Sequence, residues 1–149
     1  MAKSPALSLA FVAVLFLGLD GSADDKQNRH VRIDVSVEPS SLILGAKGEI
    51  RIQFHPFDGI RINTVPPTEL NLAEGSPLTL IGEPAVPTDP TTGYLDASKP
   101  MTYTFAVSKT ARPGTTKVNG TLVYYYCSDK EGWCLRWKDN VSLTLSIDR

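Results

Sequence analysis

The sequence predicts an all-β protein, an immunoglobulin-like antiparallel β-sandwich. Three observations predict it. Apolar and polar residues alternate at a period of two in several segments, no segment carries a helical i, i+3, i+4, i+7 stripe, and the eleven prolines fall mostly between apolar runs. Two alternating faces each need a partner sheet, which a sandwich of about 120 residues supplies. The length of 149 residues suits one domain, expected over 31–149.

The strands are expected wherever the alternation is clear. In "VRIDVSV", Val31, Ile33 and Val35 alternate with polar residues, which is typical of a half-buried strand. In chain order the expected strands are Val31–Val37, Glu49–Phe54, Met101–Val107, Thr116–Tyr126 and Val141–Ile147, with shorter apolar pieces at Glu69–Leu72 and Pro77–Gly82. The segment Glu83–Pro100 is too long for a hairpin turn and is expected to be an ordered surface loop near one end of the sandwich.

The N-terminus is predicted to be a secretory signal peptide over residues 1–23. Lys3 supplies a positive charge, Leu7–Leu19 is an unbroken apolar run, and small residues up to Ala23 offer a cleavage site. An uncleaved membrane anchor is the alternative, but the apolar run is short for a bilayer span of ~20 residues. We therefore expect cleavage after Ala23, no stable membrane insertion afterwards, and a periplasmic or secreted protein. Residues 24–30 are polar and are expected to form a flexible lead-in.

Composition and motifs argue against several classes of function. The formal net charge is -1 and no run of basic residues is visible, so nucleic-acid binding is not expected. No nucleophile elbow or phosphate-binding glycine loop is present. His30 and His55 are the only histidines, lie outside zinc-finger spacing and are expected to be solvated, so neither a metal nor another cofactor is predicted. Asn119 and Asn140 begin glycosylation-type triplets, a short pattern that is common by chance.

The two cysteines, Cys127 and Cys134, are expected to form a disulfide across the mouth of a β-hairpin. "LVYYYC" is typical of the end of one strand, "CLRW" of the start of the next, and Gly132 suits a positive-φ turn position between them. Closing so short a loop stabilises a fold by only about 2–2.5 kcal/mol, which leans toward redox use. Structural disulfides are nevertheless common in secreted proteins, so the spacing alone favours a staple.

The neighbours of the cysteines leave their chemistry open. Lys130 would stabilise a thiolate, whereas Asp129 and Glu131 would oppose it. The aromatic residues around the pair are interpreted mainly as core packing, with shielding of the sulfurs as the alternative. They are Tyr124, Tyr125, Tyr126, Trp133 and Trp137.

The segment "GTLVYYYCSDKEGWC", Gly120–Cys134, resembles the region around the cysteines in the N-terminal periplasmic domain of the DsbD thiol:disulfide interchange family. The upstream segment "FDGIRINTVPPTELNL", Phe57–Leu72, is also similar to that family. The resemblance implies an immunoglobulin-like fold whose hairpin cysteines pass electrons to or from thioredoxin-like or other extracytoplasmic thiol proteins. It implies that Cys134 exchanges with partners and that Cys127 is the resolving cysteine.

The resemblance also implies neighbouring residues and a donor. Tyr124 and Trp133 match aromatic positions of the family, and Tyr94 is the candidate lid residue of a cap loop. The turn between the cysteines is one residue longer than in the family, and "LRW" follows Cys134 in place of an aromatic residue and prolines. A separate membrane protein would have to supply electrons. The predicted function is thus a component of thiol–disulfide exchange, and the alternative is a non-enzymatic immunoglobulin-like interaction module with a structural disulfide.

Overall fold

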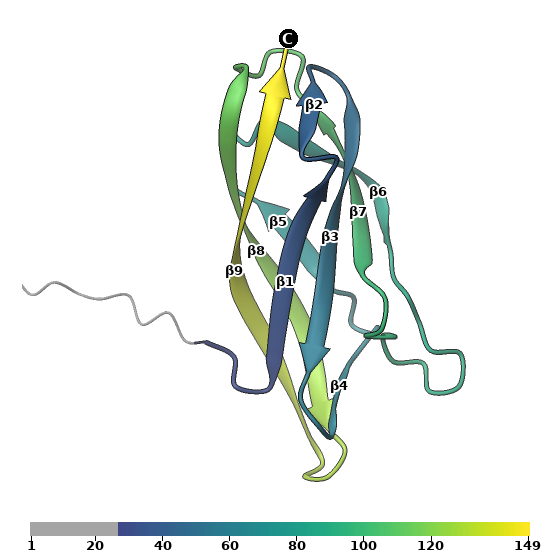
Figure 1. Cartoon of the computed structure of the whole chain (residues 1–149). Helices are drawn as coiled ribbons and strands as arrows, with labels where there is room; N and C mark the ends of the chain where they lie inside the picture. Colours follow the sequence, from purple (N-terminus) through teal and green to yellow (C-terminus); the bar gives the residue numbers. More distant parts are fainter. Residues whose placement is uncertain (1–26) are drawn as a thin grey trace, which may run out of the picture.

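The chain folds into two β-sheets packed face to face (Figure 1). The structure is a computed structural model that describes residues 27–149. Its strands are β1 (Val31–Glu38), β2 (Ser41–Ile43), β3 (Lys47–Pro56), β4 (Ile60–Ile62), β5 (Glu69–Leu72), β6 (Leu78–Ala85), β7 (Met101–Val107), β8 (Gly114–Ser128) and β9 (Trp133–Asp148). The described part of the chain contains no helix long and apolar enough to cross a membrane.

The strand order within the sheets is that of an immunoglobulin-like sandwich. One sheet has the order β1-β3-β7-β6, and the other has the order β2-β9-β8-β4, with β5 also paired to β8. These orders correspond to the ABED and GFC arrangements of the immunoglobulin fold. All strand pairs are antiparallel except β2 with β9. The predicted all-β fold class is confirmed.

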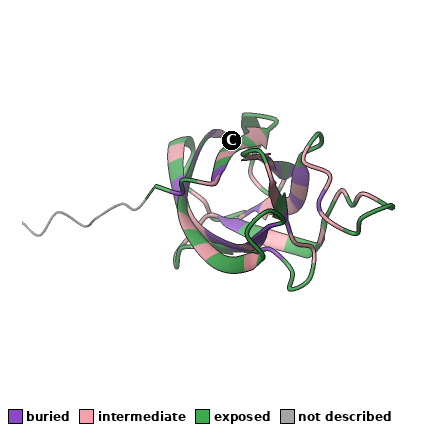
Figure 2. Cartoon of the chain, turned by 90° about the horizontal axis from the view of Figure 1, so that it is seen from below, coloured by how far each residue is buried: buried purple, intermediate pink, exposed green. Residues whose placement is uncertain are grey.

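The core lies between the two sheets and follows the predicted alternation. On β7, Met101, Tyr103 and Phe105 point inward and are at most 6% exposed. They face Leu122, Tyr124 and other inward residues of β8 within one apolar cluster. The end-on view shows strands whose buried and more exposed positions alternate around this interior (Figure 2). Burial of apolar side chains from both sheets therefore holds the sandwich together.

The sequence pattern missed two short strands and underestimated two long ones. β2 and β4 have three residues each, which is too short to show a period of two. β8 and β9 extend to 15 and 16 residues because their pairing continues unbroken from Gly114↔Ile147 to Ser128↔Trp133. Polar residues hid this length in the sequence, at the ends of β8 and at Lys138–Asn140 in the middle of β9.

The expected flexible lead-in is wrong for its last residues. Asn28 is only 8% exposed, and its Oδ1 accepts hydrogen bonds from the backbone N–H groups of His30 (2.8 Å) and Val31 (3.2 Å). Its Nδ2 donates to the hydroxyl of Tyr124 at 2.9 Å. A polar side chain that satisfies buried partners is fixed in place. The predicted signal peptide and residues 24–26 lie outside the described residues.

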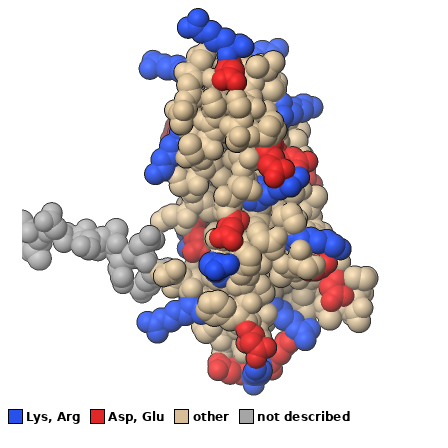
Figure 3. All heavy atoms as spheres, in the orientation of Figure 1, with Lys and Arg blue, Asp and Glu red and all other residues tan. Residues whose placement is uncertain are grey.

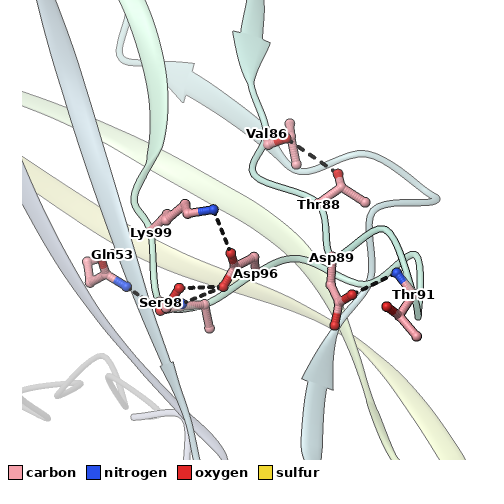
Figure 4. A network of polar contacts seen from close by, with 9 residues as sticks. Gln53, Val86, Thr88, Asp89, Thr91, Asp96, Ser98 and Lys99 are labelled. Carbon is pink, nitrogen blue, oxygen red and sulfur yellow. Dashed lines mark hydrogen bonds and ion pairs between the residues drawn. The ribbon is translucent and has the colours of Figure 1, made fainter.

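The segment between β6 and β7 is an ordered surface loop, as predicted. It projects from the sandwich in Figure 1 and is held by short-range hydrogen bonds (Figure 4). The Oδ1 of Asp96 accepts from the Ser98 hydroxyl at 2.6 Å, and this hydrogen bond lowers the pKa of the Asp96 carboxyl. Gln53 of β3 donates to the Ala97 carbonyl at 2.6 Å. The loop is thus tied both to itself and to the first sheet.

Gly120→Ala is expected to destabilise the fold by about 1–3 kcal/mol because the site has no room for a methyl group. A Cβ at Gly120 would lie 2.7 Å from the backbone oxygen of Asn71, where β5 pairs with β8. Chemical denaturation would measure the loss. The neighbouring exposed substitution Asn119→Ala serves as the control, and equal stability of the two variants would contradict the close approach of β5.

Candidate functional site

The disulfide lies at the turn end of the β8–β9 hairpin, as the sequence predicted. Cys127 and Cys134 are direct register partners with a Cα–Cα distance of 4.0 Å, and their sulfurs are bonded. The turn Asp129–Gly132 joins the strands, and Gly132 adopts the positive φ (70°) expected of it. Its N–H donates to the Ser128 carbonyl at 2.9 Å. The turn and the register together bring the two sulfurs face to face.

The disulfide occupies the outer face of its sheet, away from the core. Successive side chains of a strand point to opposite faces. Tyr126 is fully buried in the core, so its neighbour Cys127 points outward. The two cysteines differ in exposure, because Cys127 is 8% exposed whereas Cys134 belongs to the exposed residues. An attacking group from solvent therefore meets Cys134 first.

Polar side chains surround the buried member of the pair. Arg61 of β4 is the register partner of Cys127 on its other side and forms an ion pair with Asp129. The Oδ1 of Asn63 lies 3.2 Å from the Sγ of Cys127. A disulfide sulfur carries no proton, so this is a close contact in the oxidised form. After reduction a Cys127 thiol can donate a hydrogen bond to the same oxygen.

The structure brings the candidate lid residue Tyr94 close to this site. Its ring lies under the guanidinium of Arg61, with 5.3 Å from the Arg61 Cζ to the ring centroid. The loop is attached to the chain around β4, since the Leu95 N–H donates to the Ile62 carbonyl at 3.0 Å. The Thr64 hydroxyl donates to the Gly93 carbonyl at 2.7 Å. Tyr94 therefore contacts Arg61, which lies next to Cys127 in the sheet.

The other two predicted neighbours, Tyr124 and Trp133, are on the opposite face of the sheet. Tyr124 is fully buried in the core. Trp133 packs edge-on against His30 and Tyr126, with centroid distances of 5.1 and 5.9 Å. Because Trp133 immediately precedes Cys134 on a strand, its side chain faces the other way. Core packing, the favoured interpretation of these rings, is confirmed for both residues.

Tyr124 belongs to a buried polar network beneath the hairpin. Its hydroxyl donates to Asp139 at 2.9 Å and accepts from Asn28 at 2.9 Å. The other oxygen of Asp139 accepts from the indole N–H of Trp137 at 2.8 Å. Burial, followed by the negative charge of Asp139, raises the pKa of the Tyr124 hydroxyl. Asn28 and Asp139 also border a cleft of about 380 Å³ between β1 and β9.

Both histidines make specific contacts and are not simply solvated, contrary to expectation. His30 packs against the aromatic rings of Tyr126 and Trp133, and the Nε2 of His55 lies 2.7 Å from a carboxylate oxygen of Asp34. Among residues 27–149, no three His, Cys, Asp or Glu side chains are grouped as a metal ion would require.

Arg61 and Asn63 are site residues that the sequence did not predict. They contact the cysteine region because β4 pairs with β8, a connection between positions more than sixty residues apart. No local pattern in a single sequence indicates such a pairing. The three-residue length of β4 also removed the signal of a strand.

Comparison with known proteins identifies no family. No family model matches the sequence, and no curated protein matches it. Among solved structures, murine CRIg aligns with a TM-score of 0.39 and 10% sequence identity, over 80% of this chain and 99% of that chain. At this level of similarity the alignment says nothing about function.

Tyr124→Phe is expected to lower the free energy of unfolding by about 1–3 kcal/mol, because Asn28 and Asp139 lose a buried partner. The rate of disulfide reduction by dithiothreitol should stay unchanged, since Tyr124 faces away from the sulfurs. Denaturation and reduction kinetics measure the two effects. Faster or slower reduction at unchanged stability would contradict the separation of the two faces.

The same variant has an expected pH signature. An unfolded tyrosine ionises near pH 10, whereas folded Tyr124 keeps its proton to higher pH. The free energy of unfolding of the wild type should therefore fall as pH rises above 10, and it should fall less steeply in Tyr124→Phe. The free energy of unfolding of Tyr124→Phe should still fall somewhat with pH, because burial also raises the pKa of Tyr103, to about 12.

Proposed function

We propose that the protein is an extracytoplasmic component of thiol–disulfide exchange that passes electrons through the Cys127–Cys134 pair. The main support is the unequal exposure of two bonded cysteines on the outer face of a sheet. Exchange requires one sulfur that a partner can reach and a second that is released and later closes the bond. The exposed Cys134 and the buried Cys127 suit these two roles.

The exchange proceeds through a mixed disulfide. A partner thiolate attacks the Sγ of Cys134, the Cys127–Cys134 bond breaks, and Cys127 leaves as a thiolate with the electron pair. A second thiolate of the partner then attacks the partner's own sulfur in the mixed disulfide and releases Cys134. The partner dithiol is thereby oxidised and the pair is reduced, gaining two electrons and two protons. Each step is reversible, so reduced Cys134 can equally attack an oxidised partner.

The surroundings of Cys127 favour its departure. A cation and a hydrogen-bonding amide both stabilise a thiolate relative to a thiol. Arg61 lies beside Cys127 in the sheet, and Asn63 contacts its sulfur. The amide of Asn63 can turn to present Nδ2–H to a thiolate, since its oxygen and nitrogen are interchangeable in position. Asp129 offsets part of the charge of Arg61 through its ion pair.

The fold leaves the disulfide free to open. Fifteen register pairs hold β8 and β9 together, and the pair of cysteines is the second from the turn. The core residues of both strands lie on the other face. Opening the bond thus removes one covalent link at the end of a hairpin that packing already fixes. Thioredoxin-like or other periplasmic or secreted thiol proteins are the proposed partners, with electrons from a separate membrane donor.

Cys127→Ser is expected to form mixed disulfides at least about tenfold faster than Cys134→Ser, because access limits exchange. Each variant is mixed with a thioredoxin-like protein that retains one cysteine, activated as its thionitrobenzoate disulfide. Release of thionitrobenzoate gives the rate, and the product is stable because neither protein has a second thiol. Equal rates would contradict the assigned roles. Failure of both variants to react would favour the alternative, a binding module with a structural disulfide.

The double variant Cys127→Ser/Cys134→Ser is expected to stay folded and to lose at most about 2–2.5 kcal/mol of stability, the value for closing a short loop. Circular dichroism and urea denaturation of the double variant, compared with the oxidised wild type, measure this loss. Unfolding of the double variant under native conditions would mean that the disulfide is required for the fold.

A further inference from the structure

Two basic side chains follow Cys134 on the outer face of β9. Arg136 and Lys138 are two and four residues beyond Cys134, so all three side chains point to the same face, and all three are exposed. At about 3.3 Å per residue, the Cα atoms of Arg136 and Lys138 lie roughly 7 and 13 Å from that of Cys134. The reachable sulfur therefore stands at one end of a short basic row.

The charges of this basic row, Arg136 and Lys138, are not neutralised by neighbours. Among residues 27–149, neither side chain forms an ion pair, whereas most charges at the tip of the hairpin are paired and Glu131 is the exception there. The tip, where acidic and basic groups mix at the lower end of Figure 3, contains the pairs Arg61–Asp129 and Lys130–Asp58. The carboxylate of Glu131 accepts from the indole N–H of Trp133.

The strand that carries the basic row is open to an approaching molecule. Within residues 27–149, β9 pairs with β2 only at its end, from Ser146 to Asp148, so around Cys134 its paired neighbour is β8 alone. The nearest acidic residue across the sheet is Glu69, which is the register partner of Val123 on β8, and Val123 is in turn the register partner of Lys138. Two strand spacings, about 10 Å, separate Glu69 from Lys138. The net charge beside Cys134 on this face is positive.

We propose that Arg136 and Lys138 select a thiol protein whose reacting sulfur is flanked by acidic residues. This inference rests on the proposed exchange function and adds the chemical class of its partner. Opposite charges on two approaching surfaces raise the rate of productive encounter, and like charges lower it. The two cations lie roughly 7 and 13 Å along the strand from Cys134, and this spacing matches several residues of a protein surface better than the single charge of a small thiol.

The proposal is tested with the intact disulfide protein and three peptide thiols: Glu-Glu-Cys-Glu-Glu, Gln-Gln-Cys-Gln-Gln and Lys-Lys-Cys-Lys-Lys. Reduction of the disulfide is followed by alkylation and mass spectrometry, and rates are normalised to the thiolate concentration of each peptide. At about 10 mM salt, where charges interact over ~30 Å, the acidic peptide should react at least about fivefold faster than the basic one. At about 1 M salt the ratio should approach one.

Substitutions identify the residues responsible. Arg136→Glu/Lys138→Glu should reverse the preference at low salt. A matched pair of single changes separates local from overall charge: Lys138→Glu should reduce the preference, whereas Lys117→Glu should leave it unchanged. Lys117 is an exposed residue of β8, ten positions from Cys127, or roughly 33 Å along the strand. Circular dichroism confirms that each variant is folded.

Each other outcome has a defined meaning. Two outcomes would overturn this inference alone: reaction of all three peptides at the same rate, or a preference for the acidic peptide that survives Arg136→Glu/Lys138→Glu. Either outcome would mean that the two cations only protect an exposed strand edge. The anionic small thiol 2-mercaptoethanesulfonate is compared with neutral 2-mercaptoethanol. Faster reaction of the anionic small thiol, with no charge preference among the peptides, would mean that the basic row selects a small anionic thiol. That result would contradict selection of a protein partner. No reaction with any thiol would overturn the exchange function as well.

Discussion

The register of the β8–β9 hairpin is the constraint on which the rest of the structure depends. Pairing of Cys127 with Cys134 fixes every other pair along the two strands, because a shift by one residue would turn each side chain to the opposite face. In this register the aromatic side chains of Tyr124 and Tyr126 enter the core, and both cysteine side chains lie on the outer face of the sheet. One hairpin therefore separates the residues that stabilise the fold from those that can carry chemistry.

This separation is the reason to expect that the disulfide contributes little to the stability of the fold. The packed face of the hairpin is held by apolar contacts with the opposite sheet, and the network of Asn28, Tyr124 and Asp139 adds hydrogen bonds on that same side. The opposite face carries the disulfide, the contact with Asn63 and the cations of β9, which form no ion pair with the part of the chain that the structure describes. Opening the bond changes the outer face and leaves the core contacts intact, which is the behaviour that thiol–disulfide exchange requires.

Much of the fold, but only part of the site, could be predicted from the sequence. Alternation over Val31–Val37 and Met101–Val107 gave their strands correctly, since period two reports directly which face is buried. Gly132 and the flanking strands likewise predicted the hairpin and its disulfide. The burial of Asn28 and the approach of Asn63 to Cys127 escaped prediction, because both depend on contacts between distant segments. The family resemblance implied that Trp133 neighbours the sulfurs, whereas alternation along the strand turns its side chain toward the core.

The reduction potential of the Cys127–Cys134 pair tests the central claim most directly. The oxidised protein is equilibrated with dithiothreitol and glutathione buffers of known potential, and the reduced fraction is measured by alkylation and mass spectrometry. If thiol–disulfide exchange is the function of the pair, its reduction potential should lie above about -300 mV, in the range of roughly -280 to -180 mV where thiol-exchange proteins operate. A potential below about -300 mV would place the bond among structural disulfides and contradict the account.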